Sequence, residues 1–440
     1  MERYVIELIR RIRESLFALP LLVIALCGVL AFVALYLDAR FGETLKDWPL
    51  ILGTTVSGAR AIAASVAGAT ITVAAIVFSI TALSTQMAAN QYSPRALGEF
   101  FEDPFQQAII GLVVGTFTYS LLVLGSLGSG IIDGSAATPS ASVTLAIVLG
   151  VASAIGIVAY INHSLRRMQI DSVVQRIAAD AIKAIHRHLH DDQKEDEPGD
   201  GPSPRGAARA IRSDIGGWVV SIDAEAALKA LPPASTARVD VRVGEAVSIG
   251  DRIITVWPDP GDEWHGESHI HRTITTAHER SLELDPTFGI RQLVDIALRA
   301  LSPGVNDPTT AVDVIHHLKR PVRTVLLSDA PRRVFAGPDN RKVFLSRAPG
   351  RSEYVHAAFT EIRLAAAGQP YVIRALLEVL GDLKSDLAYA DMSERGGPVT
   401  EELELTLTMA RSSQLPEADL RRVLEQWASN DYLEEVDSSG

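Results

Sequence analysis

The 440-residue sequence lacks most features that mark an enzyme or a nucleic-acid-binding protein. Its single cysteine, Cys27, excludes an intramolecular disulfide and a cysteine-based metal site within one chain. Its net charge of -12 argues against nucleic acid as a partner, because phosphate binding needs clustered Lys and Arg. It has no Walker loop, dinucleotide fingerprint or nucleophile elbow, so we expect neither an enzyme nor a cofactor.

Charged residues are also missing from four long apolar runs near the N-terminus, at residues 16–37, 61–92, 104–127 and 140–161. Each run is long enough to cross the hydrocarbon core of a bilayer, which is about 30 Å thick. The runs predict a four-helix transmembrane domain over residues 1–164. Because no Asp, Glu, Lys, Arg or His lies inside them, a proton pump or an ion-coupled transporter is disfavoured.

Basic residues predict the orientation of these spans. They flank the first and the fourth run: Arg3, Arg10, Arg11, Arg13, Arg166 and Arg167. The connection at residues 128–139 has no Lys or Arg. The loop expected over residues 38–59 must then lie on the same side of the membrane, despite Arg40 and Lys46. Since positive charge stays on the cytoplasmic side, both termini are expected in the cytoplasm.

The second run carries a polar stripe with a period of seven residues, made of Ser65, Thr72, Ser79 and Gln86. Small residues repeat beside it at the same period: Gly68, Ala75, Ala82 and Ala89. A seven-residue period keeps side chains near one face of a helix. Two interpretations follow: close helix–helix packing, or the lining of a water-filled path assembled from several copies of the chain.

The connection between the second and third runs is short and acidic. Ser93 and Asp103 each precede a proline, the pattern of a helix N-cap followed by Pro at the first helical position. Glu99, Glu102 and Asp103 would favour cations at an inner mouth if the stripe lines a pore. The alternative is an ordinary solvated turn.

The remaining sequence predicts an α+β cytoplasmic region. A connecting helix and an acidic linker fill residues 165–206, and a small barrel-like β unit with one helix follows at 207–260. An α+β domain with a helical C-terminal part is expected over 261–440. In it we predict a helix from Thr273 to Arg280, an N-cap at Asp307 and a strand over residues 325–327.

The one histidine-rich stretch of this region contains His265, His269 and His271, close to Glu263 and Glu267. Imidazole and carboxylate groups together can hold zinc or a similar ion. No helical or strand period sets a geometry there, so a solvated, titrating segment is the alternative to a weak metal site.

Three further sequence motifs indicate the family of this chain. The first is Gln91-Tyr92-Ser93-Pro94-Arg95, followed by Asp103 and Gln107. The second comprises Asp285, Phe288, Gly289 and Arg291. The third runs from Arg299 through Ser302, Pro303, Gly304, Asn306, Asp307, Pro308, Thr309 and Thr310 to Ala311. Together these motifs resemble a bacterial membrane-protein family known only as domain of unknown function 2254. The resemblance covers nearly the full length. It implies a location in the bacterial inner (plasma) membrane, but no activity, fold or ligand.

These observations favour a homo-oligomeric channel or pore for ions. The second transmembrane helix would line the path, and the cytoplasmic domain would gate it. The rival hypothesis is a membrane-anchored cytoplasmic ligand sensor or scaffold that does not conduct. The expected partners are the lipid bilayer, further copies of the chain and inorganic ions.

Overall fold

The computed structural model describes residues 18–45, 52, 54–91, 103–128, 139–167, 170–189, 206–280, 282, 285–329, 333–413 and 415–428. The chain divides into two compact units, Met1–Gln169 and Ile170–Gly440. The predicted motif residues Tyr92, Ser93, Pro94 and Arg95 lie outside the described residues, as do Glu99 and Glu102.

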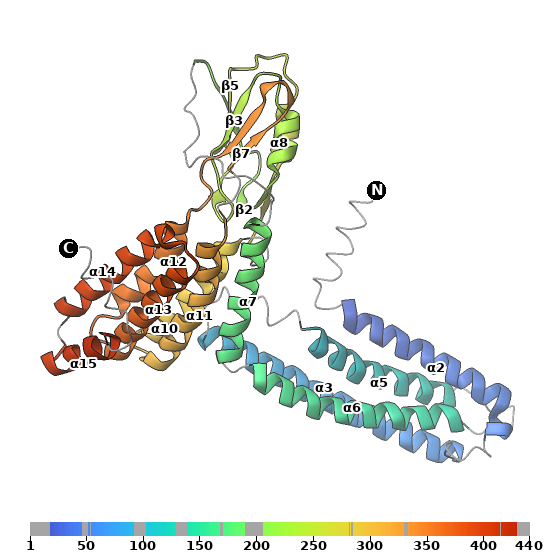
Figure 1. Ribbon diagram of the computed structural model, residues 1–440. Coiled ribbons are helices and arrows are strands. Elements are labelled where there is room, and N and C mark those ends of the chain that lie inside the picture. The colour runs from blue at the N-terminus through green and yellow to red at the C-terminus, as the bar shows by residue number, and fades with distance from the viewer. Residues whose placement is uncertain are drawn as a thin grey trace. The chain divides into compact units, whose positions relative to one another are not determined.

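The described residues of the first unit form four helices that lie side by side (Figure 1): α2 (Ala18–Leu45), α3 (Val56–Gln91), α5 (Pro104–Gly128) and α6 (Ser140–Arg167). Each contains a segment long and apolar enough to cross a membrane. In α3 this segment is Val56–Leu83, so the helix extends two turns beyond it. The four predicted spans are therefore confirmed as helices of the required length and composition.

Helix α2 is longer than the sequence indicated, and this places one charged residue inside the bundle. The sequence predicts a loop that starts at Asp38, but α2 continues to Leu45, and the Asp38 side chain is fully buried. Its carboxylate accepts hydrogen bonds from the backbone N–H groups of Ala141 (2.8 Å) and Ser142 (2.9 Å). A negative charge at the first turn of α6 satisfies N–H groups that have no partner within that helix.

Glycines allow α2 and α5 to approach closely. A Cβ atom at Gly115 would lie 2.7 Å from the Cys27 Sγ atom, and one at Gly111 would lie 2.9 Å from the Val23 Cβ atom. Both distances are shorter than van der Waals contact, so any larger residue would push the helices apart. Gly111 and Gly115 thus act as the small-xxx-small pair that is typical of membrane helix packing.

The second unit contains eight strands among its described residues: β1 (Arg209–Arg212), β2 (Gly217–Ile222), β3 (Thr236–Val239), β4 (Ala246–Val247), β5 (Arg252–Trp257), β6 (Ile274–Ala277), β7 (Val334–Ala336) and β8 (Lys342–Leu345). Five form a sheet in the order β1-β5-β3-β8-β7, and three form a sheet in the order β4-β2-β6. Both sheets are open, so the predicted barrel is not confirmed. All neighbours pair antiparallel except β3 and β8, which are parallel.

The described helices of this unit are α7 (Ile170–Leu189), α8 (Ala224–Ala230), α9 (Glu267–His271), α10 (Pro286–Ala300), α11 (Pro308–Leu327), α12 (Arg351–Ala365), α13 (Pro370–Tyr389), α14 (Gly397–Ser412) and α15 (Glu417–Ala428), with 3₁₀ turns η2 (Pro338–Asn340) and η3 (Ser393–Gly396). Helices α7 and α10 to α14 pack together, and α15 packs against α13. Gly289 allows the close approach of α10 to α7, since a Cβ atom there would lie 2.6 Å from the Ala181 Cβ atom.

Two predicted elements of this region are wrong. The segment expected to be a helix from Thr273 to Arg280 contains strand β6, which pairs with β2. The expected strand over residues 325–327 is the last turn of α11, which continues through Pro321. In both cases tertiary packing outweighs the local sequence pattern. Strand β6 pairs within a sheet, and Val325 and Leu326 at the end of α11 are buried.

Candidate functional site

The polar stripe of α3 faces away from the other three helices. The stripe and the small residues beside it are all exposed: Ser65, Gly68, Thr72, Ala75, Ser79, Ala82 and Gln86. A Cβ atom at Gly68 would meet no other atom within 4 Å. The side chain of Ala89 lies outside the described residues. The stripe therefore takes no part in packing among the described helices of one chain.

A different set of small residues packs α3 into the bundle. The buried face consists of Ala59, Ala63, Ala67, Thr70, Ala74 and Val77. At about 100° per residue, Ala74 lies roughly 180° around the helix from Ser65. The stripe thus points almost directly away from the bundle interior.

Each stripe hydroxyl donates a hydrogen bond to its own helix. Ser65 Oγ lies 2.8 Å from the Ala61 carbonyl oxygen, and Ser79 Oγ lies 2.9 Å from that of Ala75. Thr72 Oγ1 makes the same bond to the Gly68 carbonyl oxygen at 2.9 Å. Because the proton is directed back into the helix, the lone pairs of each oxygen remain free on the exposed side.

The exposed faces of the neighbouring helices carry mainly large apolar side chains. On α2 they carry Leu22, Leu26, Phe32, Val33 and Phe41, and on α6 they carry Val148, Val151, Ile155 and Val158. Large apolar side chains are suited to contact with lipid tails. The bundle therefore has two apolar outer faces and, on α3, one mixed outer face, where hydroxyls and small residues lie among some large apolar side chains.

Asp103, expected at an inner mouth, is only 7% exposed. As predicted, it precedes Pro104 at the start of α5, and its Oδ1 atom accepts a hydrogen bond from the Phe105 N–H at 3.0 Å. Its Oδ2 atom lies 2.8 Å from His163 Nε2 on α6. The carboxylate therefore links two helices of one chain, and this use of Asp103 differs from the expected ring of free acids.

Polar contacts between the spanning helices were not expected from the sequence. Thr81 Oγ1 lies 2.6 Å from Tyr160 Oη, and Thr116 Oγ1 lies 3.0 Å from Ser153 Oγ. With Asp38, these pairs link helices through groups that are costly to leave unpaired in an apolar interior. The only signal in the sequence was a polar residue within an apolar run.

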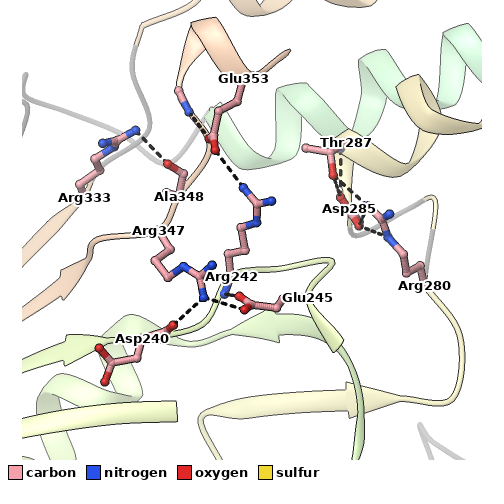
Figure 2. Close-up of polar contacts among 11 residues, drawn as sticks. Asp240, Arg242, Glu245, Arg280, Asp285, Thr287, Arg333, Arg347, Ala348 and Glu353 are labelled. Carbon is pink, nitrogen blue, oxygen red and sulfur yellow. Dashed lines mark hydrogen bonds and ion pairs between the residues drawn. The ribbon is translucent and has the colours of Figure 1, made fainter. Parts of the chain in front are cut away.

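In the second unit, Asp285 lies at the meeting point of strands and helices (Figure 2). It is the N-cap of α10, where its Oδ1 atom accepts from the N–H of Thr287 at 3.0 Å. Its Oδ2 atom accepts from Arg280 Nε and Nη2 at 2.8 and 2.6 Å. The Arg280 guanidinium lies 4.8 Å from the centre of the Phe288 ring. A side chain at Gly244, whose φ is +83°, would collide with Asp285.

Two further ion pairs join the strand region to the start of α12 and to the loop before it. Arg242 Nη1 lies 3.0 Å from Glu353 Oε1, and Arg347 Nη1 lies 2.6 Å from Glu245 Oε1. Figure 2 shows both pairs beside the Arg280–Asp285 contact. All of these charges are paired, so this junction has the character of a structural connection.

The third motif forms the turn between α10 and α11. Residues 303–306 of this turn are exposed, and Asn306 has a left-handed φ of 47°. Asp307 is the predicted N-cap, with Pro308 at the first helical position. The Thr310 hydroxyl donates to Asp307 Oδ2 at 2.7 Å, and this bond lowers the pKa of Asp307. The motif therefore fixes a helix–turn–helix corner.

The two motif arginines differ in their partners. Arg291 Nη2 lies 2.6 Å from Asp295 Oδ1, and Arg291 also pairs with Glu361 of α12. Arg299 Nε is buried and has no hydrogen-bond partner among the described residues. Ser302 ends α10 by donating its hydroxyl to the Arg299 carbonyl oxygen at 2.6 Å.

The histidines proposed as metal ligands are not brought together. Among the described residues, no group of three or more His, Cys, Asp or Glu side chains is placed to hold a metal ion. His269 and His271 lie two residues apart on the short helix α9, so they point to different sides. His271 Nδ1 lies 3.3 Å from Asp214 Oδ1 instead.

Comparison with known proteins places these features in a family. Residues 13–382 match the family model described as "Predicted membrane protein (DUF2254)". Uncharacterized proteins of Mycobacterium bovis and Mycobacterium tuberculosis are each 31% identical to this chain over 391 residues, which is 87% of this chain and 73% of the relative. No solved structure matches the chain significantly.

Proposed function

The chain belongs to the DUF2254 family of predicted membrane proteins, and we propose that it is the subunit of a homo-oligomeric ion channel. In this role α3 lines the conducting path, and the second unit gates it. The observation that carries the proposal is the outward direction of the polar stripe on α3. A channel of this kind is not an enzyme, and it needs no cofactor.

The contrast between the outer faces supports assembly through α3. The exposed faces of α2 and α6 suit lipid, whereas α3 presents Ser65, Thr72 and Ser79 beside glycine and alanine. Small residues allow neighbouring helices to approach closely in a membrane. A ring of copies would therefore turn α3 toward its axis and leave α2 and α6 in lipid.

The hydrogen bonds of the stripe favour cations as the permeant ions. Each hydroxyl proton is donated to the preceding turn, so the exposed side of Ser65, Thr72 and Ser79 offers oxygen lone pairs. Rings of oxygen dipoles replace part of the hydration shell of a cation. Asp103 is not available for this purpose, since it is paired with His163.

The orientation follows from charge. With the arginines of the N-terminus and of the α6 end on the same side, both termini lie in the cytoplasm of a bacterial cell. The second unit begins at Ile170, only three residues after the end of α6 at Arg167. The gating role proposed for the second unit therefore rests on this short connection along the chain.

Purified protein in planar bilayers should show single-channel currents that are selective for cations. Thr72→Leu and Ser79→Leu should reduce the conductance, because each replaces a lining oxygen with an apolar side chain in every copy. Ala154→Leu, which enlarges an exposed position on α6, is the control and should leave the conductance unchanged. Absence of current in every lipid and ion condition would refute the channel.

One observation favours the rival, a membrane-anchored sensor or scaffold. Because the stripe hydroxyls are satisfied within their own helix, they can face lipid at a low energetic cost. In that case α3 needs no partner. A monomeric mass in detergent, together with silent bilayers, would favour this function over a channel.

A further inference from the structure

Two large apolar side chains lie on the same outward face of α3 as the polar stripe. Ile76 is 47% exposed and Leu83 is 57% exposed. At about 100° per residue, Leu83 falls in line with Ser65, and Ile76 falls within about 20° of it. They therefore point away from the bundle together with the hydroxyls, opposite the buried Ala74.

Their position along the helix is equally specific. From one end of the stripe to the other, the outward side chains follow the order Ser65, Thr72, Ile76, Ser79, Leu83 and Gln86. Ile76 and Leu83 are separated by seven residues, or roughly 10 Å of helix, with Ser79 between them. Leu83 is the last residue of the apolar segment Val56–Leu83.

We propose that Ile76 and Leu83 form a hydrophobic gate in the path that α3 lines. The inference rests on the channel proposed above and deepens it. In a ring of copies, these side chains project farther toward the axis than serine, threonine, glycine or alanine at the neighbouring positions. Two apolar rings close a path by excluding water from it, even where the opening is wide enough for an ion.

The chain offers a matched control. Ile71 lies on the same helix and is 46% exposed, nearly the same fraction as Ile76. It lies about 120° around the helix from Ser65, and therefore off the outward face. Ile71→Ser and Ile76→Ser make the same chemical change at the same exposure, and they differ only in direction.

The test measures open probability of the full-length protein in planar bilayers. Ile76→Ser and Leu83→Ser should each raise the open probability about tenfold, because every copy loses apolar surface at the constriction. Ile71→Ser should leave it unchanged. The mass of each variant in detergent is measured in parallel, which shows that assembly is preserved.

The outcomes separate the gate from the channel. In one outcome the parent conducts and Thr72→Leu lowers its conductance, but Ile76→Ser and Leu83→Ser have the same open probability as the parent. The proposal of a gate is then wrong, and the proposal of a channel stands. An equal effect of Ile71→Ser also overturns the gate. If the parent and all serine variants are silent, both inferences fail. A silent parent with conducting Ile76→Ser and Leu83→Ser variants supports both.

Discussion

Individual carboxylates show most clearly what local chemistry contributes to this protein. Asp307 caps α11 through the N–H and the hydroxyl of Thr310. Asp285 caps α10 and also binds Arg280. Asp38 caps α6 from a different helix. All three carboxylates accept hydrogen bonds from backbone N–H groups at the start of a helix. They differ in the sequence separation between the carboxylate and that helix.

For the Asp307 cap we predict a pH-dependent stability. Asp307→Ala should lower the free energy of unfolding by about 1 kcal/mol at pH 7, since a helix loses its capping acceptor. The folded pKa of Asp307 lies below its unfolded value. The charged cap therefore stabilises fully above the unfolded pKa of about 3.9, and this contribution is lost as the pH falls through the folded pKa.

Intrinsic fluorescence can follow this unfolding in the full-length protein. Four of the five tryptophans belong to the second unit: Trp218, Trp257, Trp264 and Trp427. The control is Asp262→Ala, which removes an exposed partner of Arg209 and should change stability much less. A stability loss in Asp307→Ala that does not shrink at acid pH would contradict a role for the charge.

The caps also show which single residues the sequence can predict. Asp307 was predicted as an N-cap because its signal, an aspartate before a proline, is contained in adjacent residues. Asp38 was assigned to a loop because its partners, Ala141 and Ser142, lie more than one hundred residues away. Nothing near Asp38 in the sequence indicates a helix end to be capped.

At the scale of elements, tertiary packing determines the secondary structure of segments whose local sequence pattern is ambiguous. Residues 274–277 became strand β6 because β2 offers a partner to the segment. Helix α11 continues through Pro321 because residues on both sides of the proline are buried. The open five-stranded sheet combines β3 with β8, about one hundred residues later in the chain. A barrel assembled from neighbouring strands alone could not include that pairing.

The close contact between α2 and α5 yields a prediction at this scale. Gly115→Val should loosen the pair, because its side chain collides with Cys27. Overpacking of this kind costs about 1–3 kcal/mol. Cys27 is 3% exposed and is the single thiol of the chain, so its labelling by a membrane-permeant maleimide reports opening of the contact. We expect labelling to become about tenfold faster.

Gly125→Val provides the comparison for this measurement. Gly125 lies on the same helix, and a Cβ atom there would meet nothing within 4 Å. This variant should label Cys27 at the rate of the parent. If both valine variants label at the parental rate, the close approach at Gly115 does not limit access to Cys27.

For the whole molecule, composition predicted a membrane part and a more polar part. This was possible because long apolar runs can be recognised from consecutive residues alone. The direction of the α3 stripe was not predictable. A seven-residue period shows that Ser65, Thr72 and Ser79 share a face, but it does not show what that face meets. Only the burial of Ala63, Ala67 and Ala74 identifies the other side as the one that packs.

Assembly through α3 can be tested because the chain has no exposed thiol of its own among its described residues. Thr72→Cys and Ser79→Cys place a thiol on the outward face, and a short bis-maleimide should then link copies into dimers within native membranes. Ile155→Cys places an exposed thiol on the apolar face of α6 and should remain monomeric on a denaturing gel. The parent, with Cys27 buried, sets the background. Equal crosslinking at residues 72 and 155 would mean random collision in the bilayer, and crosslinking at 155 alone would place the contact between copies on α6.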